Sequence, residues 1–309
     1  MFFIEILKAI AQGIVEGITE WLPVSSTGHI LLLDAAWPML GGAEFFDVFK
    51  VVIQLGAIFA VVVLYFHKLN PFSPKKTAAE KKGTWVLWGK VLIASVPAAV
   101  VGLLIDDWLD GMEAQHKGVF LYIIAAIIPS GVVGVLFDDW MDEHLHNGIV
   151  VAIALIVYGI AFILVERRNN GKHLRLTADV HDISWKKAIG IGIFQCLSLV
   201  PGTSRSGSTI LGAIMLGVGR GAGAEFSFFM AIPTMVGASG IKLLKFVLSG
   251  VGITSTEIAV LLVGCVVSFI VSLLVIKGLM EYVRKHSFSA FGVYRIILGA
   301  IVLAYFVMK

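Results

Sequence analysis

Six long apolar segments constrain what this chain can fold into more than any other feature. A helix needs about 20 mostly apolar residues to cross the hydrocarbon core of a bilayer. The segments that approach or reach this length are 45–66, 90–105 with its lead-in Trp85–Trp88, 149–165, 226–248, 257–277 and 288–308. The composition agrees, because 58% of the residues are apolar and only 15% are charged, whereas soluble domains have roughly 45–50% and about 25%. The sequence therefore predicts an all-α polytopic membrane protein, formed by a single membrane domain over residues 1–309.

Two further apolar segments, 5–40 and 188–218, are interrupted by proline, glycine and small hydroxyl residues. The interruptions are Pro23-Val-Ser-Ser-Thr-Gly28 and Pro201-Gly-Thr-Ser-Arg-Ser-Gly207. Backbone that leaves a helix at membrane depth is tolerated only where protein or a water-filled cavity satisfies its hydrogen bonds. We therefore expect each segment to form a re-entrant helix–turn–helix that lines a cavity.

The two halves of the chain resemble each other. Residues 44–57 align with residues 225–238 at an offset of 181, and the two interrupted segments align at an offset of 179. Each half, 1–165 and 188–309, then contains one re-entrant helix–turn–helix followed by three transmembrane helices. Because three is odd, the second half is inverted relative to the first. An inverted repeat of this kind places its site near mid-membrane, where the broken helices meet.

A shorter tandem repeat lies inside the first half. Residues 93–110 recur at 125–142 with ten of 18 positions identical, which indicates a duplicated insert near 111–142. A full membrane crossing by the apolar stretch 119–137 would place the basic segment 166–187 outside the cell. We therefore expect 119–137 to enter and leave the membrane on the external side.

The placement of lysine and arginine predicts which loops face the cytoplasm. Loops 67–90 and 166–187 carry six basic residues each, together half of the 24 in the chain. Loops 106–118 and 138–148 are acidic. Cytoplasmic loops are enriched in Lys and Arg, so we expect the basic pair inside and the acidic pair outside.

Three polar side chains in the first interrupted segment form one stripe. Gln12, Glu16 and Glu20 are four residues apart, so they lie on the same face of a helix. Two neighbouring carboxylates repel each other unless a cation lies between them, and such a pair suits a divalent metal, a general base or both. The alternative is a polar stripe that faces partner helices or head groups. Ionisable groups inside a membrane segment favour the functional interpretation.

The residues after Pro23 suit phosphate chemistry. Ser25, Ser26 and His29 fall at the start of the second half-helix, where free backbone N–H groups and the positive end of the helix dipole favour phosphate. Ser26 and His29 lie three residues apart on one face and could act as a nucleophile and its partner. The alternative is an N-cap serine beside a hydrogen-bonded histidine.

The second interruption brings an arginine to the equivalent turn. Arg205 follows Ser204, and its planar guanidinium can bind two phosphate oxygens at once. The alternative is a structural ion pair of Arg205 with Glu16 or Glu20. Taken together, the two turns carry carboxylates, hydroxyls, an imidazole and a guanidinium. This set predicts phosphoryl chemistry on a membrane-borne substrate.

These residues resemble the undecaprenyl-diphosphate phosphatase family, of the bacitracin-resistance protein type. The resemblance rests on Gln12-xxx-Glu16-xxx-Glu20 with the following Trp21–His29, and on Pro201–Gly207. It implies hydrolysis of undecaprenyl diphosphate to the monophosphate, which recycles the lipid carrier of peptidoglycan synthesis. It also implies a divalent cation, Mg²⁺ or Ca²⁺, and a homodimer among the lipids of the bacterial plasma membrane, with an active site that opens to the external face.

Carried over by position, the resemblance assigns roles to individual residues. Glu16 and Glu20 match the acidic motif, as metal ligands or base, and Ser26 and His29 match two candidate nucleophiles. The residues matched to phosphate binding are Ser25, Ser204, Arg205 and Thr209. We favour Ser26 as the nucleophile, activated by Glu20 or His29, and direct attack by water is the alternative.

A transporter or flippase of polyprenyl-phosphate lipids is the alternative function. Inverted repeats with broken helices are typical of transporters, and the charged cavity residues would then bind an anionic head group or couple to protons. Phosphate release from a polyprenyl diphosphate separates the two functions. The net charge of +3 gives no indication of nucleic-acid binding.

Overall fold

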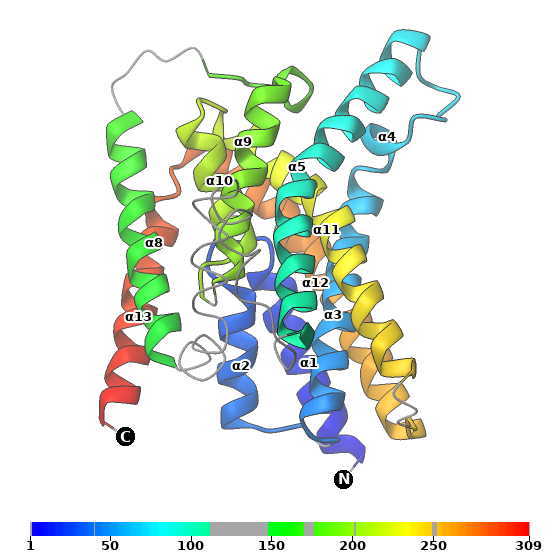
Figure 1. Cartoon of the computed structure of the whole chain (residues 1–309), viewed down its shortest axis with the longest axis vertical. Coiled ribbons are helices and arrows are strands. Elements are labelled where there is room, and N and C mark those ends of the chain that lie inside the picture. Colours follow the sequence, from blue (N-terminus) through cyan, green and yellow to red (C-terminus); the bar gives the residue numbers. More distant parts are fainter. Residues whose placement is uncertain are drawn as a thin grey trace.

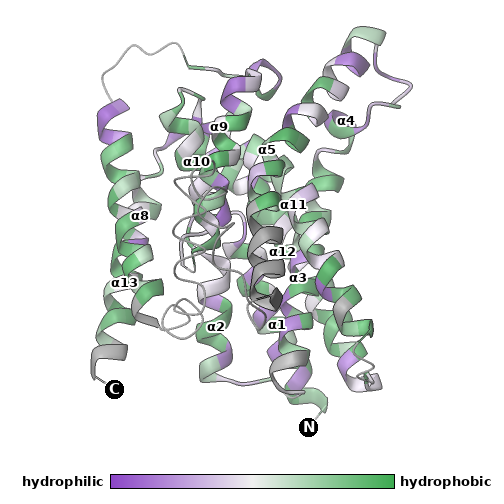
Figure 2. Ribbon diagram, in the orientation of Figure 1, coloured by the Kyte–Doolittle hydropathy of each residue, from purple (hydrophilic) through white to green (hydrophobic). Residues whose placement is uncertain are grey.

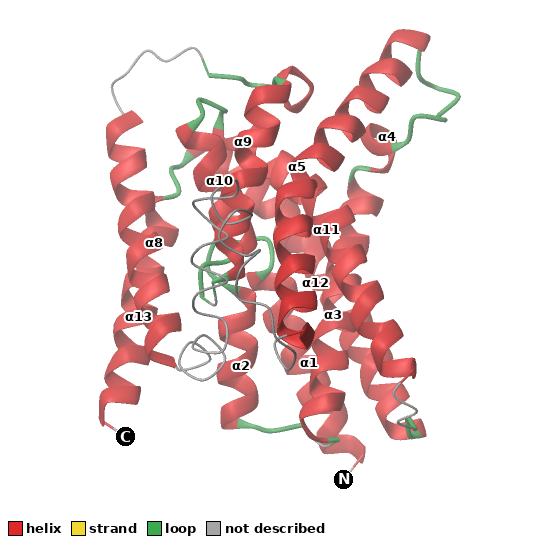
Figure 3. Cartoon of the chain, viewed as in Figure 1, coloured by secondary structure: helices red, strands yellow, loops and turns green. Residues whose placement is uncertain are grey.

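The computed structural model describes residues 2–39, 41–111, 148–169, 176–200, 202–248 and 252–308. Within these ranges the regular structure is helical (Figure 3). The one extended pairing that the described residues form is an isolated parallel bridge between Thr177 and Val218. The prediction of an all-α protein is therefore confirmed over this part of the chain.

The helices of the two halves follow one another in a similar order (Figure 1). The first half consists of α1 (Phe2–Thr19), α2 (Ser26–Ala36), α3 (Gly42–Leu64), α4 (Phe66–Leu69), α5 (Ala78–Gly111) and α8 (Gly148–Asn169). The second half consists of η1 (Val180–Asp182), α9 (Trp185–Cys196), η2 (Leu197–Leu199), α10 (Arg205–Met215), α11 (Arg220–Leu248), α12 (Ser255–Lys285) and α13 (Ser289–Met308). The predicted stretch 119–137 lies outside the described residues.

Within the described ranges, five helices are long and apolar enough to cross a membrane. Their candidate spans are Phe45–Leu64, Ala78–Val100, Val150–Asn169, Arg220–Leu248 and Ser255–Lys285. The sixth predicted span forms α13, whose apolar part is the shorter Ser289–Ala304. The coarse prediction of a polytopic membrane protein is thus confirmed.

Helix α5 begins earlier than the predicted segment 90–105. A reciprocal capping box starts it, in which the backbone N–H of Thr77 donates to Glu80 Oε2 (2.7 Å) and that of Glu80 donates to Thr77 Oγ1 (3.3 Å). This arrangement satisfies backbone donors that a helix start leaves free. The apolar pattern alone does not contain this signal, because the capping residues are polar.

Helix α12 shows how the outer faces suit lipid. A stripe of large apolar side chains, each about half exposed or more, follows one side of the helix: Ile258, Leu262, Val266, Ile270 and Leu274. The spacing of four keeps them on one face, while Gly264, Ser268 and Ser272 are buried on another. Figure 2 shows mostly hydrophobic helix bodies along the bundle, with hydrophilic residues at its ends and between the helices. Such a continuous exposed apolar face marks contact with a membrane.

The interrupted segments form two helical hairpins that point towards each other. Hairpin one (α1 and α2) rises from the lower end of Figure 1 and returns to it, and hairpin two (α9 and α10) does the same from the upper end. Their turns meet near mid-height, where Ser206 Oγ donates to the backbone oxygens of Glu20 (3.1 Å) and Leu22 (3.0 Å). The prediction of two helix–turn–helix elements is confirmed.

The described parts of the two basic loops lie at the same end of the molecule. Helix α4 with the start of α5, and the segment leading into α9, both occupy the upper end of Figure 1. This agrees with the expectation that loops 67–90 and 166–187 share one side of the membrane. The end of α5 and the start of α8 both lie in the lower half of the same view.

Candidate active site

The turn of hairpin one is built by a short break after α1. The backbone N–H of Glu20 still donates to the carbonyl of Glu16 (3.0 Å), so Glu20 continues the face of α1. Ser25 precedes α2 in a left-handed conformation, with φ of 76°. An L-residue seldom adopts this conformation, and here it brings Ser26, the first residue of α2, back towards Glu20.

The turn of hairpin two also contains a serine with a positive φ. Ser204 precedes α10 with φ of 74°, and its Oγ accepts a hydrogen bond from the backbone N–H of Gly207 (3.2 Å). Gly202 also has a positive φ, 86°, which glycine adopts without strain. Arg205 is therefore the first residue of α10 and points into the space between the hairpins.

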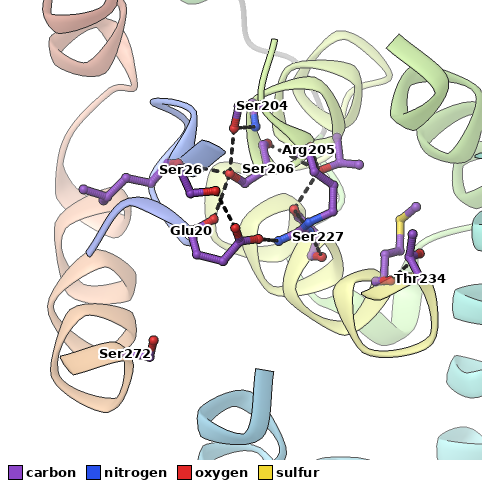
Figure 4. Close-up of polar contacts among 12 residues, drawn as sticks. Glu20, Ser26, Ser204, Arg205, Ser206, Ser227, Thr234 and Ser272 are labelled. Atoms are coloured by element: carbon purple, nitrogen blue, oxygen red, sulfur yellow. Dashed lines mark hydrogen bonds and ion pairs between the residues drawn. The ribbon is translucent and has the colours of Figure 1, made fainter. Parts of the chain in front are cut away.

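Glu20 is the centre of the polar cluster (Figure 4). Ser26 Oγ donates to Glu20 Oε2 (2.7 Å), and Arg205 Nη2 donates to Glu20 Oε1 (3.0 Å). The side chains of Glu20 and Arg205 are only 3% and 9% exposed, so this ion pair is largely screened from solvent. The structure thus joins residues that the sequence places 185 positions apart.

Ser227 holds the guanidinium of Arg205, and further hydroxyl groups form a second layer of hydrogen bonds around the cluster. The Nη1 of Arg205 donates to the backbone oxygen of Ser227 on α11 (2.8 Å). Thr209 and Ser227 share a hydrogen bond between their hydroxyls (2.6 Å), and Ser204 and Ser206 share another (3.1 Å). The predicted phosphate-binding residues Ser204, Arg205 and Thr209 therefore lie in one network. Ser25, the residue before Ser26, is also buried, but its side chain does not cap α2.

Several polar atoms around the cluster are buried and have no partner in the described part of the chain. They include Glu16 Oε1, Arg205 Nε, Trp21 Nε1 and Gln12 Oε1. Buried polar groups in native proteins are almost always paired with protein or water, so an unpaired one calls for an explanation. The free Nε–H of Arg205 and the free carboxylate oxygen of Glu16 suit an anionic ligand accompanied by a cation.

The oxygen donors fit a hard divalent cation in part. Glu16 and Glu20 supply carboxylates one helical turn apart, and Glu16 Oε1 is unpaired. Within the described ranges, no group of three or more His, Cys, Asp or Glu side chains converges on one point. Mg²⁺ commonly takes one or two carboxylates and completes its shell with waters and substrate phosphates. The two glutamates fit such a shared site, and they do not fit an all-protein cage.

His29 has different partners from Ser26. Its Nε2 lies 2.7 Å from the hydroxyl of Tyr294 on α13, and its Nδ1 lies 2.7 Å from the carbonyl oxygen of Ser25. The two rings stack with an interplanar angle of 8°. The structure therefore brings Glu20, Ser26 and Arg205 together and places the imidazole of His29 against α13.

Sequence reasoning did not single out Ser206, Ser227 or Arg295. The two serines contribute through contacts between distant helices, which no local pattern reports. Arg295 did carry a signal, because an arginine inside the predicted span 288–308 is costly in lipid and marks a functional position. Its guanidinium is fully buried and bonded to both hairpin turns.

The fold and the site together define a multi-pass membrane protein with an acid–serine–arginine cluster between two opposed hairpins. The chain belongs to the BacA family, because the family model described as "Bacitracin resistance protein BacA" matches residues 9–120 and 110–301. Together these stretches cover most of the chain. The resemblance seen in the sequence is thereby confirmed.

Curated relatives match over the full length. A protein of Enterococcus faecalis is 48% identical over 309 residues, which cover 100% of both chains. One of Lactiplantibacillus plantarum is 50% identical over 308 residues and 99% of both chains, and one of Streptococcus thermophilus is 49% identical over 100% of this chain and 96% of its own. All three are named undecaprenyl-diphosphatase.

Proposed function

We propose that this protein hydrolyses undecaprenyl diphosphate to undecaprenyl phosphate and inorganic phosphate, and thereby recycles the lipid carrier of cell-wall synthesis and confers bacitracin resistance. The names of its full-length relatives support this reaction. The observation that carries the proposal is the double role of Glu20, whose two carboxylate oxygens accept hydrogen bonds from Ser26 and Arg205. A base, a hydroxyl and a phosphate-binding group are thus held together.

In this mechanism Ser26 is the nucleophile. Its Oγ forms a bond to the terminal phosphorus while Glu20 accepts the hydroxyl proton, since the two side chains are already hydrogen-bonded (2.7 Å). The bridging P–O bond breaks, and undecaprenyl phosphate leaves with the electron pair. Water then hydrolyses the phosphoserine and releases inorganic phosphate. Direct attack by a water that Glu20 deprotonates gives the same products, and trapping of a phosphorylated residue separates the two routes.

Arg205 stabilises the charge that develops on the transferring phosphoryl group. Its Nη1 and Nη2 are fixed by Ser227 and Glu20, while its buried Nε keeps a free donor. A donor that is already oriented in a site with little water stabilises such charge at no cost of reorganisation. The ion pair with Glu20 is therefore compatible with phosphate binding, because it orients the guanidinium and leaves an N–H for the substrate.

Glu16 and Glu20 would hold a divalent cation, Mg²⁺ or Ca²⁺. The unpaired Oε1 of Glu16 supports this assignment, as does the oxygen-only donor set. When bound, such a cation neutralises charge on the diphosphate. Arg205, with its free Nε–H, would orient the anionic head group, and Glu20 keeps its hydrogen bond from Ser26.

We further propose that the two halves form an inverted repeat. Ser25 and Ser204 correspond at the offset of 179 and share nearly the same φ, 76° and 74°. Each precedes a helix of 11 residues, α2 or α10. The packing is reciprocal as well, because α1 packs on α12 whereas α9 packs on α5. Glycines at corresponding positions, Gly13 and Gly192, make these two contacts.

The protein is proposed to act in the bacterial plasma membrane as a homodimer, with its site open to the external face. The common end of the basic loops supports a cytoplasmic upper end in Figure 1. Hairpin one then enters from the external side. Labelling of single cysteines placed at positions 70 and 178 in intact cells tests the orientation, because an impermeant reagent should reach neither.

Phosphate release tests the proposed reaction directly. Purified protein in detergent, given undecaprenyl diphosphate with Mg²⁺ or Ca²⁺, should release inorganic phosphate, and Arg205→Ala should lose this activity while keeping the melting temperature of a folded protein. No release by the wild type would overturn the proposal, and movement of the intact lipid across vesicles would then favour the transport alternative. Full turnover by Arg205→Ala would remove the guanidinium from the mechanism.

A further inference from the structure

Arg295 is a buried arginine that contacts both hairpin turns. It lies on α13 with 0% exposure. We call residues 20–25, between α1 and α2, turn one, and residues 200–204, before α10, turn two. The Nη1 of Arg295 donates to the backbone oxygen of Pro23 in turn one (2.9 Å). Its Nη2 donates to the backbone oxygens of Gly202 (2.9 Å) and Thr203 (3.0 Å) in turn two. One rigid guanidinium therefore joins the two segments that carry the site.

The surroundings of Arg295 are neutral throughout the described part of the chain. No carboxylate there forms an ion pair with it, and its charge is instead met by backbone oxygens and by the ring of Tyr158, 5.4 Å from the guanidinium carbon. Removing a cation from water costs several kcal/mol even after relaxation. A hydrophobic residue would avoid this cost in the interior of α13, so general packing does not account for an arginine here.

The close approach of α10 adds a second observation. A Cβ at Gly207 would lie 3.0 Å from Arg295 Nη1, which is closer than side chains normally come. The first turn of α10 thus lacks a side chain where the guanidinium passes. The guanidinium of Arg295 is therefore held by hydrogen bonds to the two turns and by its close contact with α10.

We infer that Arg295 is a positioning residue, which fixes turn one against turn two and thereby sets the distance between Glu20 and Arg205. This inference rests on the proposed function, because it concerns the same site. Pro23 is three residues from both Glu20 and Ser26 in the chain, so a shift of turn one moves the carboxylate and the hydroxyl together. Arg295 itself is fully buried, so in this proposal it acts through the two turns.

A planar fork is required for this role. Two neighbouring nitrogens of one guanidinium can serve two acceptors at fixed separation, whereas the ammonium of lysine is a single point. A misplacement of about 1 Å in reacting groups can cost about 10²-fold in rate. Loss of the fork should therefore lower the rate of the chemical step even where the charge and the fold are kept.

Arg220 offers a matched control. Its guanidinium also forms a forked interaction, through Nε and Nη2 with the carboxylate of Glu166, which is 1% exposed. Glu166 in turn accepts from the backbone N–H of Phe288 (3.0 Å). This pair ties α8, α11 and the start of α13 together without touching either hairpin turn. Its loss should affect stability alone.

The experiment compares Arg295→Lys, Arg295→Gln and Arg220→Lys as purified full-length proteins. We measure phosphate release from undecaprenyl diphosphate at several temperatures below melting, and the melting temperature of each variant. Arg295→Lys and Arg295→Gln should lower kcat by about 10²-fold with KM changed less than about threefold. Arg220→Lys should lower the melting temperature and keep kcat within about twofold of wild type.

The outcomes separate the inference from the proposed function. An inactive wild type would remove the proposed function, whereas an active wild type with unchanged kcat in both Arg295 variants would overturn the positioning role alone. Arg295→Lys keeps a buried charge that could prevent folding. Arg295→Gln is neutral and therefore tests the role of the guanidinium without such a charge. Failure of both variants to fold would also overturn the inference, because Arg295 would then serve stability in general.

Discussion

Hairpin one and hairpin two have similar turns, but the side chains at corresponding positions differ in chemistry. At the offset of 179, Ser26 corresponds to Arg205, and both are the first residue of an 11-residue helix that follows a serine with positive φ. Both side chains donate to the same carboxylate, that of Glu20. The repeated geometry therefore delivers a nucleophile from one side and a phosphate-binding group from the other.

The acids of hairpin one have no acidic counterparts in hairpin two. Glu16 corresponds to Gln195, and Glu20 corresponds to Leu199. Gln195 donates to the hydroxyl of Thr234 (3.3 Å), a neutral contact away from the Glu20 cluster. The similar backbone of the two hairpins therefore positions the site, whereas the residues that differ between corresponding positions supply its charge.

Replacement of Glu20 should have the largest effect. In Glu20→Gln the side chain keeps its shape and an acceptor for Arg205, but it can no longer take the proton of Ser26. We expect kcat to fall by about 10³-fold, the range of a lost general base, and added Mg²⁺ or Ca²⁺ should not restore it. Steady-state phosphate release measures the effect, with Glu281→Gln, an exposed residue of α12, as the control. Turnover within tenfold of wild type would remove Glu20 from proton transfer.

Glu16→Gln gives hairpin one the residue that hairpin two has at this position, and its effect should be smaller. The variant loses a carboxylate that has a free buried oxygen but keeps the base. We expect a loss of about 10²-fold at low metal concentration, as for a weakened metal site.

The metal dependence of Glu16→Gln provides the test. Titration with Mg²⁺ and with Ca²⁺ should recover part of the rate, because a ligand of lower charge needs more cation to fill the site. The same titration of Glu20→Gln is the comparison. If neither variant responds to metal, or if both respond equally, Glu20 does not differ from Glu16 by serving as the base in addition to being a ligand.

Replacement of the corresponding glycines Gly13 and Gly192 by alanine should lower the free energy of unfolding in both halves. An added Cβ at Gly192 would lie 2.2 Å from the carbonyl oxygen of Ala94, and one at Gly13 would lie 2.7 Å from that of Gly264. Gly192→Ala and Gly13→Ala should each lower the unfolding free energy by roughly 1–3 kcal/mol, as overpacking does. Gly237→Ala on α11 meets no atom within 4 Å and should be neutral or slightly stabilising. Unfolding in mixed micelles measures all three, and equal stability of Gly192→Ala and Gly237→Ala would contradict the close packing of α9 on α5.

Much of this site could be predicted from the sequence, because its determinants are local. Pro23 and the glycines mark where the apolar segments break, and the spacing of Glu16 and Glu20 places both on one face of α1. The choice between Glu20 and His29 as partner of Ser26 could not be predicted, since both lie within reach along the chain. It depends on the left-handed turn at Ser25 and on the approach of α13, which no local pattern reports.

The smallest predicted effect concerns the two turn serines. Ser204 Oγ caps α10 by accepting from Gly207, whereas Ser25 makes no such bond to α2. Replacement of an N-cap serine by alanine costs about 1 kcal/mol, so Ser204→Ala should lower the unfolding free energy by about that amount more than Ser25→Ala. Both substitutions retain the strained positive φ, which cancels in the comparison. Unfolding of the two variants in the same micelles measures the difference, and equal losses would mean that the cap does not distinguish the hairpins. In that case the asymmetry between them would be confined to the side chains that face Glu20.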